Sequence, residues 1–372
     1  MVNKYIEYKS SGFTTDIRRE YLDLHRQFRL QKRLNIRLKK AGHLRKINQL
    51  FKLDKNEFWK SIKKMQKSSS QVDIETSYLK EHMEEIFTKH NQVSVLSPRE
   101  FEKAEDSVKF FKKDFENKKF EVDLSIEELS KMIKNLPNNK TVGLSFLSNE
   151  MLKYCDCNEV TLILKLIFEK MINHQINPTL FNLSIIKPLI KCEKKPNTDI
   201  DNIRPVAVSE PLANLFETVL LNRLNESFQE SNKQFGFRSN YSCSHAVFCL
   251  KQALKVARNL KKRLYICAID ASKAFDKVVR AKLWLELIKK DIPPPIILAF
   301  IHYYDTSLMI VSNNGKYSKI FRTLVGVRQG GVASPKLFSI YINELIERLT
   351  ECKEGLVISK IKLDTIVYAD DI

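Results

Sequence analysis

Two apolar, β-branched runs in this 372-residue chain each end in aspartate. Residues 263–269 lead into Asp270, and residues 363–369 lead into Asp370 and Asp371, which precede the last residue of the sequence. Burying an unpaired carboxylate is costly, so acids beside a core strand are usually held by a cation or a basic side chain. Two such strands lying side by side would bring Asp270 close to Asp370 and create a cation site made of carboxylates.

The adjacent acids Asp370 and Asp371 indicate a turn, because successive side chains of a strand face opposite sides of a sheet. We therefore expect both acids in a tight turn between two strands. Oxygen-only ligands suit Mg²⁺, and two such ions about 4 Å apart promote in-line displacement at phosphorus. The pattern predicts phosphoryl transfer. Taken alone, the tetrapeptide YADD (368–371) is also typical of a solvated acidic turn, and this alternative stays open.

The charge balance predicts a polyanionic partner. Basic residues exceed acidic ones by 63 to 44, which gives a formal net charge of +19, and nucleic acid fits this excess best. A membrane surface is the alternative, but no apolar run approaches the roughly 20 residues needed to span a bilayer. The run at 292–304 is shorter and has three prolines near its start. We therefore expect no membrane partner.

The N-terminus and the cysteines both predict an intracellular protein, in the nucleus, the cytoplasm or both. Residues 1–13 lack the uncharged apolar stretch of a secretory signal. The seven cysteines include no CxxC pair and are odd in number, which argues against a disulfide framework. Reduced, buried thiols are expected instead. The sequence indicates no oligomeric state.

The first part of the chain is basic and mostly helical in pattern, and we assign residues 1–115 to it. Residues 26–46 set leucines among arginines and lysines at helical spacing. This pattern is typical either of a helix that binds phosphates or of a solvated helix packed through its leucines. Helix starts are predicted at Ser97 and Ser125, because a glutamate follows each serine three residues later as in a capping box.

The remaining chain mixes helices with short strands. Helices are expected at 159–174, 212–228 and 243–260, and strands at 183–190, 263–269, 307–321 and 363–369. Asn314-Gly315 is a strong hairpin signal within the third of these strands. No regular βαβ period connects the elements, which predicts an α+β fold.

Five segments together resemble the motifs of reverse transcriptases from non-LTR retrotransposons. In chain order they are NIRPVAVSE (202–210), QFGFRSNYSCSHAV (234–247), DASKAFDKV (270–278), GVRQGGVASPKLFSIYIN (326–343) and YADD (368–371). The resemblance implies a right-hand polymerase fold over residues 116–372, with fingers and part of the palm. Residues 1–115 resemble the linker region that precedes this domain in such elements.

The resemblance also implies roles for individual residues. Asp270, Asp370 and Asp371 would hold the catalytic metal ions, Lys191 and Arg204 would contact the triphosphate, and Gln329 and Gly330 would line the nucleotide pocket. Phe275 would be a steric gate beneath the sugar, which excludes a 2′-OH and favours deoxynucleotides. Ordinary core packing is the alternative for this ring.

The function implied is that of an RNA-directed DNA polymerase, which joins dNTPs to the 3′-OH of a DNA primer on an RNA template. Mg²⁺ would be the cofactor, with Mn²⁺ as a substitute. Two alternatives stay open: an inactive retrotransposon remnant that binds RNA, and an RNA-directed RNA polymerase, against which Phe275 and RQGG (328–331) argue. The family continues beyond YADD with the rest of the palm and a thumb. We expect a chain ending at Ile372 to lack both and to polymerise poorly.

Overall fold

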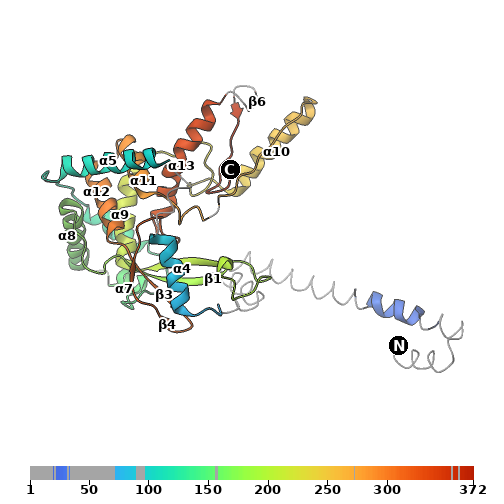
Figure 1. Ribbon diagram of the computed structural model, residues 1–372, viewed down its shortest axis with the longest axis horizontal. Coiled ribbons are helices and arrows are strands. Elements are labelled where there is room, and N and C mark those ends of the chain that lie inside the picture. Colours follow the sequence, from blue (N-terminus) through green and yellow to red (C-terminus); the bar gives the residue numbers. More distant parts are fainter. Residues whose placement is uncertain are drawn as a thin grey trace. The chain divides into compact units, whose positions relative to one another are not determined.

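The computed structural model describes most of the chain from residue 72 onward (Figure 1). The described residues are 20, 22–31, 33, 72–88, 97–155, 158–271, 273–352, 355–358 and 361–372. The chain divides into two compact units, Met1–Ser70 and Gln71–Ile372. Most of the basic helix predicted at 26–46 lies outside the described residues. The domain boundary predicted after residue 115 falls inside the second unit, and as a division into domains it stays a prediction.

A five-stranded sheet forms one part of the second unit. Its order is β2 (Ile203–Ser209), β1 (Leu183–Ile190), β3 (Leu308–Asn313) and β4 (Lys316–Tyr317), with β5 (Phe321–Arg322) also paired to β3. Strand β1 runs antiparallel to β2 and parallel to β3. Asn314 and Gly315, both at positive φ, close the β3–β4 hairpin, and the turn predicted there is confirmed.

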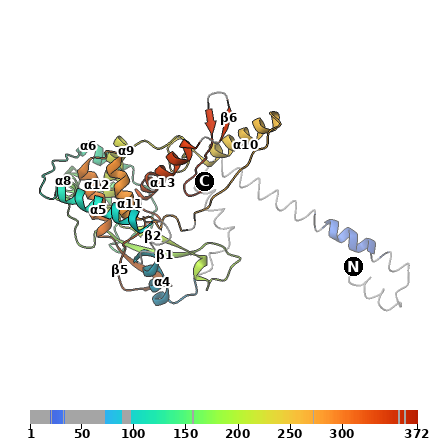
Figure 2. The ribbon, with the colours of Figure 1, turned by 45° about the horizontal axis from the view of Figure 1, so that its top comes forward.

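Helix α4 (Thr76–Thr88) packs on this sheet through an apolar stripe. Its Leu79, Met83 and Phe87 are buried at i, i+4 and i+8, the spacing of a single helix face. They form a cluster with Ile186 of β1. Figure 2 shows α4 beside β1 and β5. The helix thereby carries residues from far ahead of the predicted motifs to one face of the sheet.

The main apolar core lies among helices. These are α5 (Pro98–Phe115), α6 (Ile126–Lys134), α7 (Asn149–Tyr154), α8 (Asn158–His174), α9 (Pro211–Ser227), α11 (Arg280–Lys289), α12 (Pro294–Asp305) and α13 (Ser334–Glu351). Helix α12 contacts α8, α9 and α11, so most of its surface is buried. This burial explains why its side chains are apolar nearly all round. The run at 292–304 is therefore a core helix. None of the described helices is long and apolar enough to cross a bilayer.

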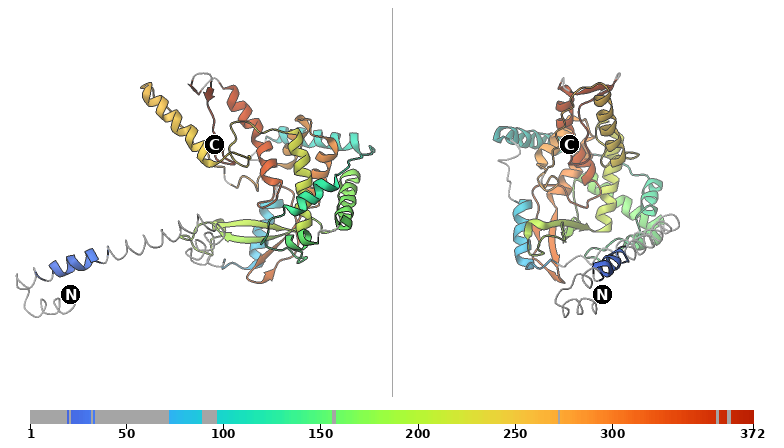
Figure 3. Two further views of the ribbon diagram at one scale, coloured as in Figure 1. Left: turned by 180° about the vertical axis from the view of Figure 1, so that it is seen from behind. Right: turned by 90° about the vertical axis from the view of Figure 1, so that its right-hand side faces the viewer.

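Helix α10 (Cys243–Asn259) differs from the helices of this core. Its buried residues are all alanine, namely Ala246, Ala253 and Ala257. Figure 3 shows α10 projecting from the helical core, at the same end as the hairpin of β6 (Leu356–Ile358) and β7 (Ile361–Leu363). Small buried side chains let one face of the helix lie close to neighbouring chain, while its other faces stay largely exposed.

The predicted helices and caps agree closely with the structure. Helices predicted at 159–174, 212–228 and 243–260 correspond to α8, α9 and α10. Ser97 and Glu100 form the complete capping box at the start of α5. At Ser125 only half of the box forms: the Ser125 hydroxyl accepts the Glu128 N–H at 3.3 Å, while the Glu128 carboxylate pairs with Arg223.

The strand predicted at 263–269 is wrong. The run is exposed, with Tyr265 85% and Ile269 51% accessible. Within the described chain, Ile269 alone among these residues has a strand-type partner, Ile372, with which it exchanges two backbone hydrogen bonds. A strand needs a hydrogen-bonded neighbour along its length, so residues 263–268 stay irregular. The strand predicted at 363–369 is also wrong: of these residues only Leu363 lies in a strand, as the last residue of β7, and isolated bridges follow at Val367 and Tyr368.

The prediction of buried cysteines is also wrong. Five of the six described free cysteines are exposed. Cys155 and Cys352 lie at the C-terminal ends of α7 and α13, and Cys243 begins α10. Helix ends lie near the surface, which explains their exposure.

The guanidinium of Arg328 is buried between the sheet and the helices. It donates to Glu217 Oε1 of α9 at 2.9 Å and to the hydroxyls of Ser184 and Ser209, on β1 and β2, at 2.9 and 3.1 Å. The second Glu217 oxygen accepts two backbone N–H groups just before α13. Both side chains are at most 1% exposed. This ion pair therefore joins two strands, one helix and the loop at 326–331.

A second buried arginine, Arg280, holds the neighbouring segment. Its guanidinium donates to the carbonyl oxygens of Tyr304, Thr323, Val325 and Gly326, and to the Thr323 hydroxyl. Burial lowers the pKa of Arg280 to about 10, so the group stays charged at neutral pH. Arg280 thereby fixes the chain that leads into the Arg328 loop.

Arg328→Met should lower the free energy of unfolding by about 3–5 kcal/mol, because it leaves the Glu217 carboxylate buried without its cation. Urea denaturation measures this change. The matched control is Arg348→Met, which breaks an exposed pair with Glu344 on α13 and should cost less than about 1 kcal/mol. Equal losses in the two variants would contradict the anchoring role of Arg328.

Candidate active site

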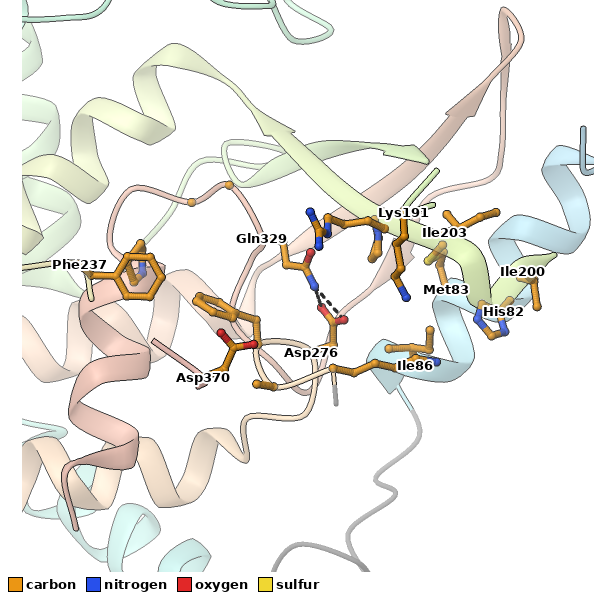
Figure 4. Close-up of a pocket in the computed structure, with 18 residues that line it drawn as sticks. His82, Met83, Ile86, Lys191, Ile200, Ile203, Phe237, Asp276, Gln329 and Asp370 are labelled. Atoms are coloured by element: carbon orange, nitrogen blue, oxygen red, sulfur yellow. Dashed lines mark hydrogen bonds between the residues drawn. The ribbon is translucent and has the colours of Figure 1, made fainter. Parts of the chain in front are cut away.

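An open cavity of about 420 Å³ brings together residues from distant parts of the sequence. Six of the eight predicted site residues line it: Lys191, Arg204, Phe275, Gln329, Gly330 and Asp370. Asp270 and Asp371 are not among its lining residues. Figure 4 shows Asp370 and Phe237 toward one end of the cavity and His82 of α4 toward the other, with Gln329 and Asp276 between them.

The two acid-bearing runs do meet in the fold. Asp270 and Asp371 form an isolated antiparallel bridge, and Ile269 and Ile372 exchange backbone hydrogen bonds of 2.7 and 3.0 Å. Tyr368 and Asp371 also bond to each other through their backbones, at 2.8 and 3.1 Å, so the YADD segment is a tight turn. The tight turn predicted for Asp370 and Asp371 is confirmed.

The donor chemistry at this turn fits a divalent cation, but the side chains do not form a complete ligand group. Carboxylate oxygens are the ligands that Mg²⁺ prefers. Among the described residues, however, no three His, Cys, Asp or Glu side chains come together in a way that could hold a metal ion. The backbones at Asp270 and Asp371 are brought together, and the role of Asp270, Asp370 and Asp371 as metal ligands stays a prediction.

Residues 234–236 hold the YADD turn through hydrogen bonds and close backbone contact. Gln234 Oε1 accepts the backbone N–H groups of Gly236 at 2.8 Å and of Ala369 at 3.1 Å. A Cβ on Gly236 would lie 2.4 Å from the Ala369 nitrogen, so only glycine allows this approach. Val367 exchanges further backbone bonds with Lys233 and Phe235. The motif at 234–247 therefore positions the acidic turn, a role that its sequence did not indicate.

Phe275 both lines the cavity and packs against the core. Its ring stacks on Phe338 of α13, with centroids 4.7 Å apart and planes at 15°, and meets Phe237 edge-on at 5.9 Å. The two interpretations of this ring are compatible, because packing on one face leaves another part of the ring at the cavity wall. The aromatic contacts hold the ring in one place.

Basic side chains gather at the α4 side of the cavity. Lys191 directly follows β1, Arg204 lies on β2, and Lys273 comes from the turn after Asp270. Lys191 Nζ donates to the Asp201 carbonyl at 2.9 Å, and Lys273 Nζ lies 3.8 Å from the Asp201 carboxylate. These cations have weak or exposed protein partners, which leaves them able to bind phosphate oxygens.

Gln329 and Gly330 are held by contacts on both sides of their loop. The Gln329 carbonyl accepts the Ala207 N–H of β2 at 2.8 Å, and the Gln329 amide donates to both Asp276 carboxylate oxygens at 2.9 Å. Gly330 has φ +114, and a Cβ there would lie 2.6 Å from the Ala207 oxygen. Burial raises the pKa of Asp276 to about 6.

Sequence reasoning missed three titratable residues that line this cavity. Lys273 and Asp276 lie inside the motif at 270–278, so position within a catalytic motif was the available signal. His82 had no such signal, because α4 carries none of the five motifs. Partial burial, with Lys273 nearby, lowers the pKa of His82.

Comparison with known proteins shows which family the second half of the chain resembles. Residues 193–372 match the family model described as reverse transcriptase (RNA-dependent DNA polymerase). The matched region contains all five motifs, so the motif resemblance is confirmed.

Relatives among known proteins place this domain with those of non-LTR retrotransposons. The chain is 29% identical over 226 residues to a probable RNA-directed DNA polymerase from transposon BS of Drosophila melanogaster, covering 60% of this chain and 25% of the relative. It is 27% identical over 254 residues to the RNA-directed DNA polymerase from mobile element jockey of the same species, covering 67% and 27%. With the Pol polyprotein from type-1 retrotransposable element R2 of Nasonia vitripennis it shares 30% identity over 183 residues, covering 48% and 18%. The chain thus spans about a quarter of the length of these relatives, or less.

Asp276→Asn should remove a pH dependence of stability. A folded-state pKa raised from 3.8 to about 6 means that the native state binds more protons than the unfolded state between these values. Wild-type stability should therefore fall by about 2 kcal/mol more than that of the Asn variant between pH 4.5 and pH 7.5. Urea unfolding at both pH values measures the difference, with Asp305→Asn, an exposed acid, as control. Parallel pH profiles for wild type and Asp276→Asn would contradict the buried titration.

Proposed function

We propose that this chain is the polymerase part of a non-LTR retrotransposon protein, which extends a DNA primer with dNTPs on an RNA template. The observation that carries this proposal is the cavity itself. The cavity is lined by an acid, an aromatic ring, an amide and several cations. These groups come from residues between Lys191 and Asp370, within or directly beside the matched range 193–372. This set is suited to a nucleoside triphosphate: positive charge for its phosphates and an apolar wall for its sugar.

Each group has a part in binding or orienting the substrates. Arg204, Lys191 and Lys273 bind the triphosphate, Arg204 through its planar fork. Phe275 limits the space beneath the sugar. Reverse transcriptases use divalent metal ions, and we propose Mg²⁺, or Mn²⁺ as a substitute, held by Asp270, Asp370 and Asp371. When bound, such an ion neutralises phosphate charge and favours attack by the primer hydroxyl.

The partners follow from charge and from the family. The net charge of +19 supports binding to the phosphate backbones of an RNA template and a DNA primer, with an affinity that falls steeply with salt. A protein acting on these substrates works inside the cell, so we propose the nucleus or cytoplasm as its location. An RNA-binding remnant without activity is the second candidate, because the described residues lack a three-ligand acidic group.

Asp370→Asn should reduce primer extension by about 100-fold or more, because an amide cannot replace a carboxylate at a cation site. The measurement is extension of a DNA primer on an RNA template with dNTPs and Mg²⁺, with Asp305→Asn as the unaffected control. Extension at the wild-type rate by Asp370→Asn would refute the role of this acid. Template–primer binding without extension by the wild-type chain would favour the remnant.

Phe275→Ala should raise incorporation of NTPs relative to dNTPs by about tenfold or more, because removing the ring opens space for a 2′-OH. Phe275→Tyr keeps the ring and should keep the wild-type ratio. Single-nucleotide incorporation with dTTP and with UTP gives the ratio for each variant. An unchanged ratio in Phe275→Ala would leave the ring a packing residue only, and a wild-type preference for UTP would favour an RNA-directed RNA polymerase.

A further inference from the structure

The wall of the cavity contains a buried acid whose partner is a glutamine amide. Asp276 is 3% exposed, and its two carboxylate oxygens each lie 2.9 Å from Gln329 Nε2. Figure 4 shows the Gln329 amino group directed at Asp276 and the amide oxygen directed away from it. None of the motif-based roles involves Asp276.

Both sides of this contact are fixed by the backbone. Asp276 closes a turn in which its N–H bonds to the Lys273 carbonyl at 3.1 Å. The Val327 N–H bonds to the Phe275 carbonyl at 2.9 Å, which ties the loop of Gln329 to the same turn. Gly326, at φ +76, lies so close to the turn that a Cβ would be 2.7 Å from the backbone carbonyl oxygen of Asp276. The two side chains are therefore held together before any ligand binds.

An ionised carboxylate selects one orientation of the glutamine amide. A carboxylate only accepts hydrogen bonds, so it binds the amino group of an amide and not its oxygen. The Gln329 amino group is therefore the part of the amide that hydrogen-bonds to Asp276. In the described parts of the chain, no group donates a hydrogen bond to Gln329 Oε1. Gln329 lines the cavity, so this oxygen is an acceptor available to a ligand that carries a donor.

We propose that Asp276 is a positioning residue for nucleotide recognition: it holds the Gln329 amide so that the amide oxygen accepts a hydrogen bond from the 3′-hydroxyl of the incoming dNTP. The inference rests on the proposed function, because it takes the cavity to be a dNTP site. The 3′-OH is the one hydroxyl on the sugar of a dNTP, and Phe275, which we propose lies beneath that sugar, lines the same cavity. Burial raises the pKa of Asp276 only to about 6, so the carboxylate is ionised at the pH of the test.

The test measures nucleotide binding without catalysis. The full chain is assembled at pH 8 on an RNA template with a DNA primer that ends in a dideoxynucleotide, so that no bond forms. Titration calorimetry then gives the Kd of dTTP and of its 2′,3′-dideoxy analogue. The proteins are wild type, Asp276→Asn, Gln329→Ala and the double variant, with Asp305→Asn as the matched control for loss of an acid. Thermal unfolding checks that each variant is folded.

Wild type and Asp305→Asn should bind dTTP about tenfold more tightly than the dideoxy analogue, as expected for one hydrogen bond. Asp276→Asn should weaken this preference while binding the dideoxy analogue within about twofold of wild type, because an Asn amide offers both a donor and an acceptor and so no longer selects one orientation of the Gln329 amide. The double variant should match Gln329→Ala. Asp276→Ala, which offers the amide no partner, should show the same loss and replaces the Asn variant if that variant does not fold.

Three results would overturn the inference without touching the proposed function. The first is a dTTP preference retained by the Asp276 variants. The second is a double variant that loses more preference than Gln329→Ala, which would mean that Asp276 acts independently of Gln329. The third is a wild-type chain that binds both nucleotides equally, which leaves the proposed polymerase function intact. A folded wild-type chain that binds neither nucleotide would instead refute the dNTP site itself, and the inference with it.

Discussion

The ion pair between Arg328 and Glu217 is the interaction on which the second unit depends. Two charges removed from water are stable only where each has partners in good geometry. Arg328 meets this need with Glu217 and the hydroxyls of Ser184 and Ser209, while Glu217 also accepts two backbone N–H groups. The pair therefore requires β1, β2, α9 and the start of α13 to lie in one arrangement.

The shape of the cavity depends on this ion pair, because Gln329 and Gly330 line the cavity and directly follow Arg328. With Arg328 fixed, the backbone of Gln329 bonds to Ala207 of β2 and its side chain reaches Asp276. Arg280 holds the preceding segment through four carbonyl oxygens. The buried charges thus act on the cavity indirectly: they set the position of a loop, and the loop sets the position of Gln329 and Gly330 in the cavity wall.

Much of this fold could be predicted from local patterns, and the failures have a common cause. The Ser97 capping box and the Asn314-Gly315 turn depend on residues close in sequence, and both form as predicted. The strand at 263–269 does not form, because strand structure depends on a neighbour that residues 263–268 do not meet. Asp276 was missed for a similar reason: its motif gave only its position, and its contact with Gln329 joins residues 53 apart in the chain.

The sequence by itself determined the family resemblance, the order of the motifs and the identity of the acids, because each of these depends only on residues that are adjacent in the chain. It also predicted that Asp370 and Asp371 occupy a tight turn, since strand alternation forbids both acids from facing one site. Only the tertiary structure decided that α4 brings His82 to the cavity, that residues 234–236 support the acidic turn, and that Asp276 binds the Gln329 amide. Each of these contacts joins residues whose separation in the chain carries no periodic signal, so packing and buried hydrogen bonds alone bring them together.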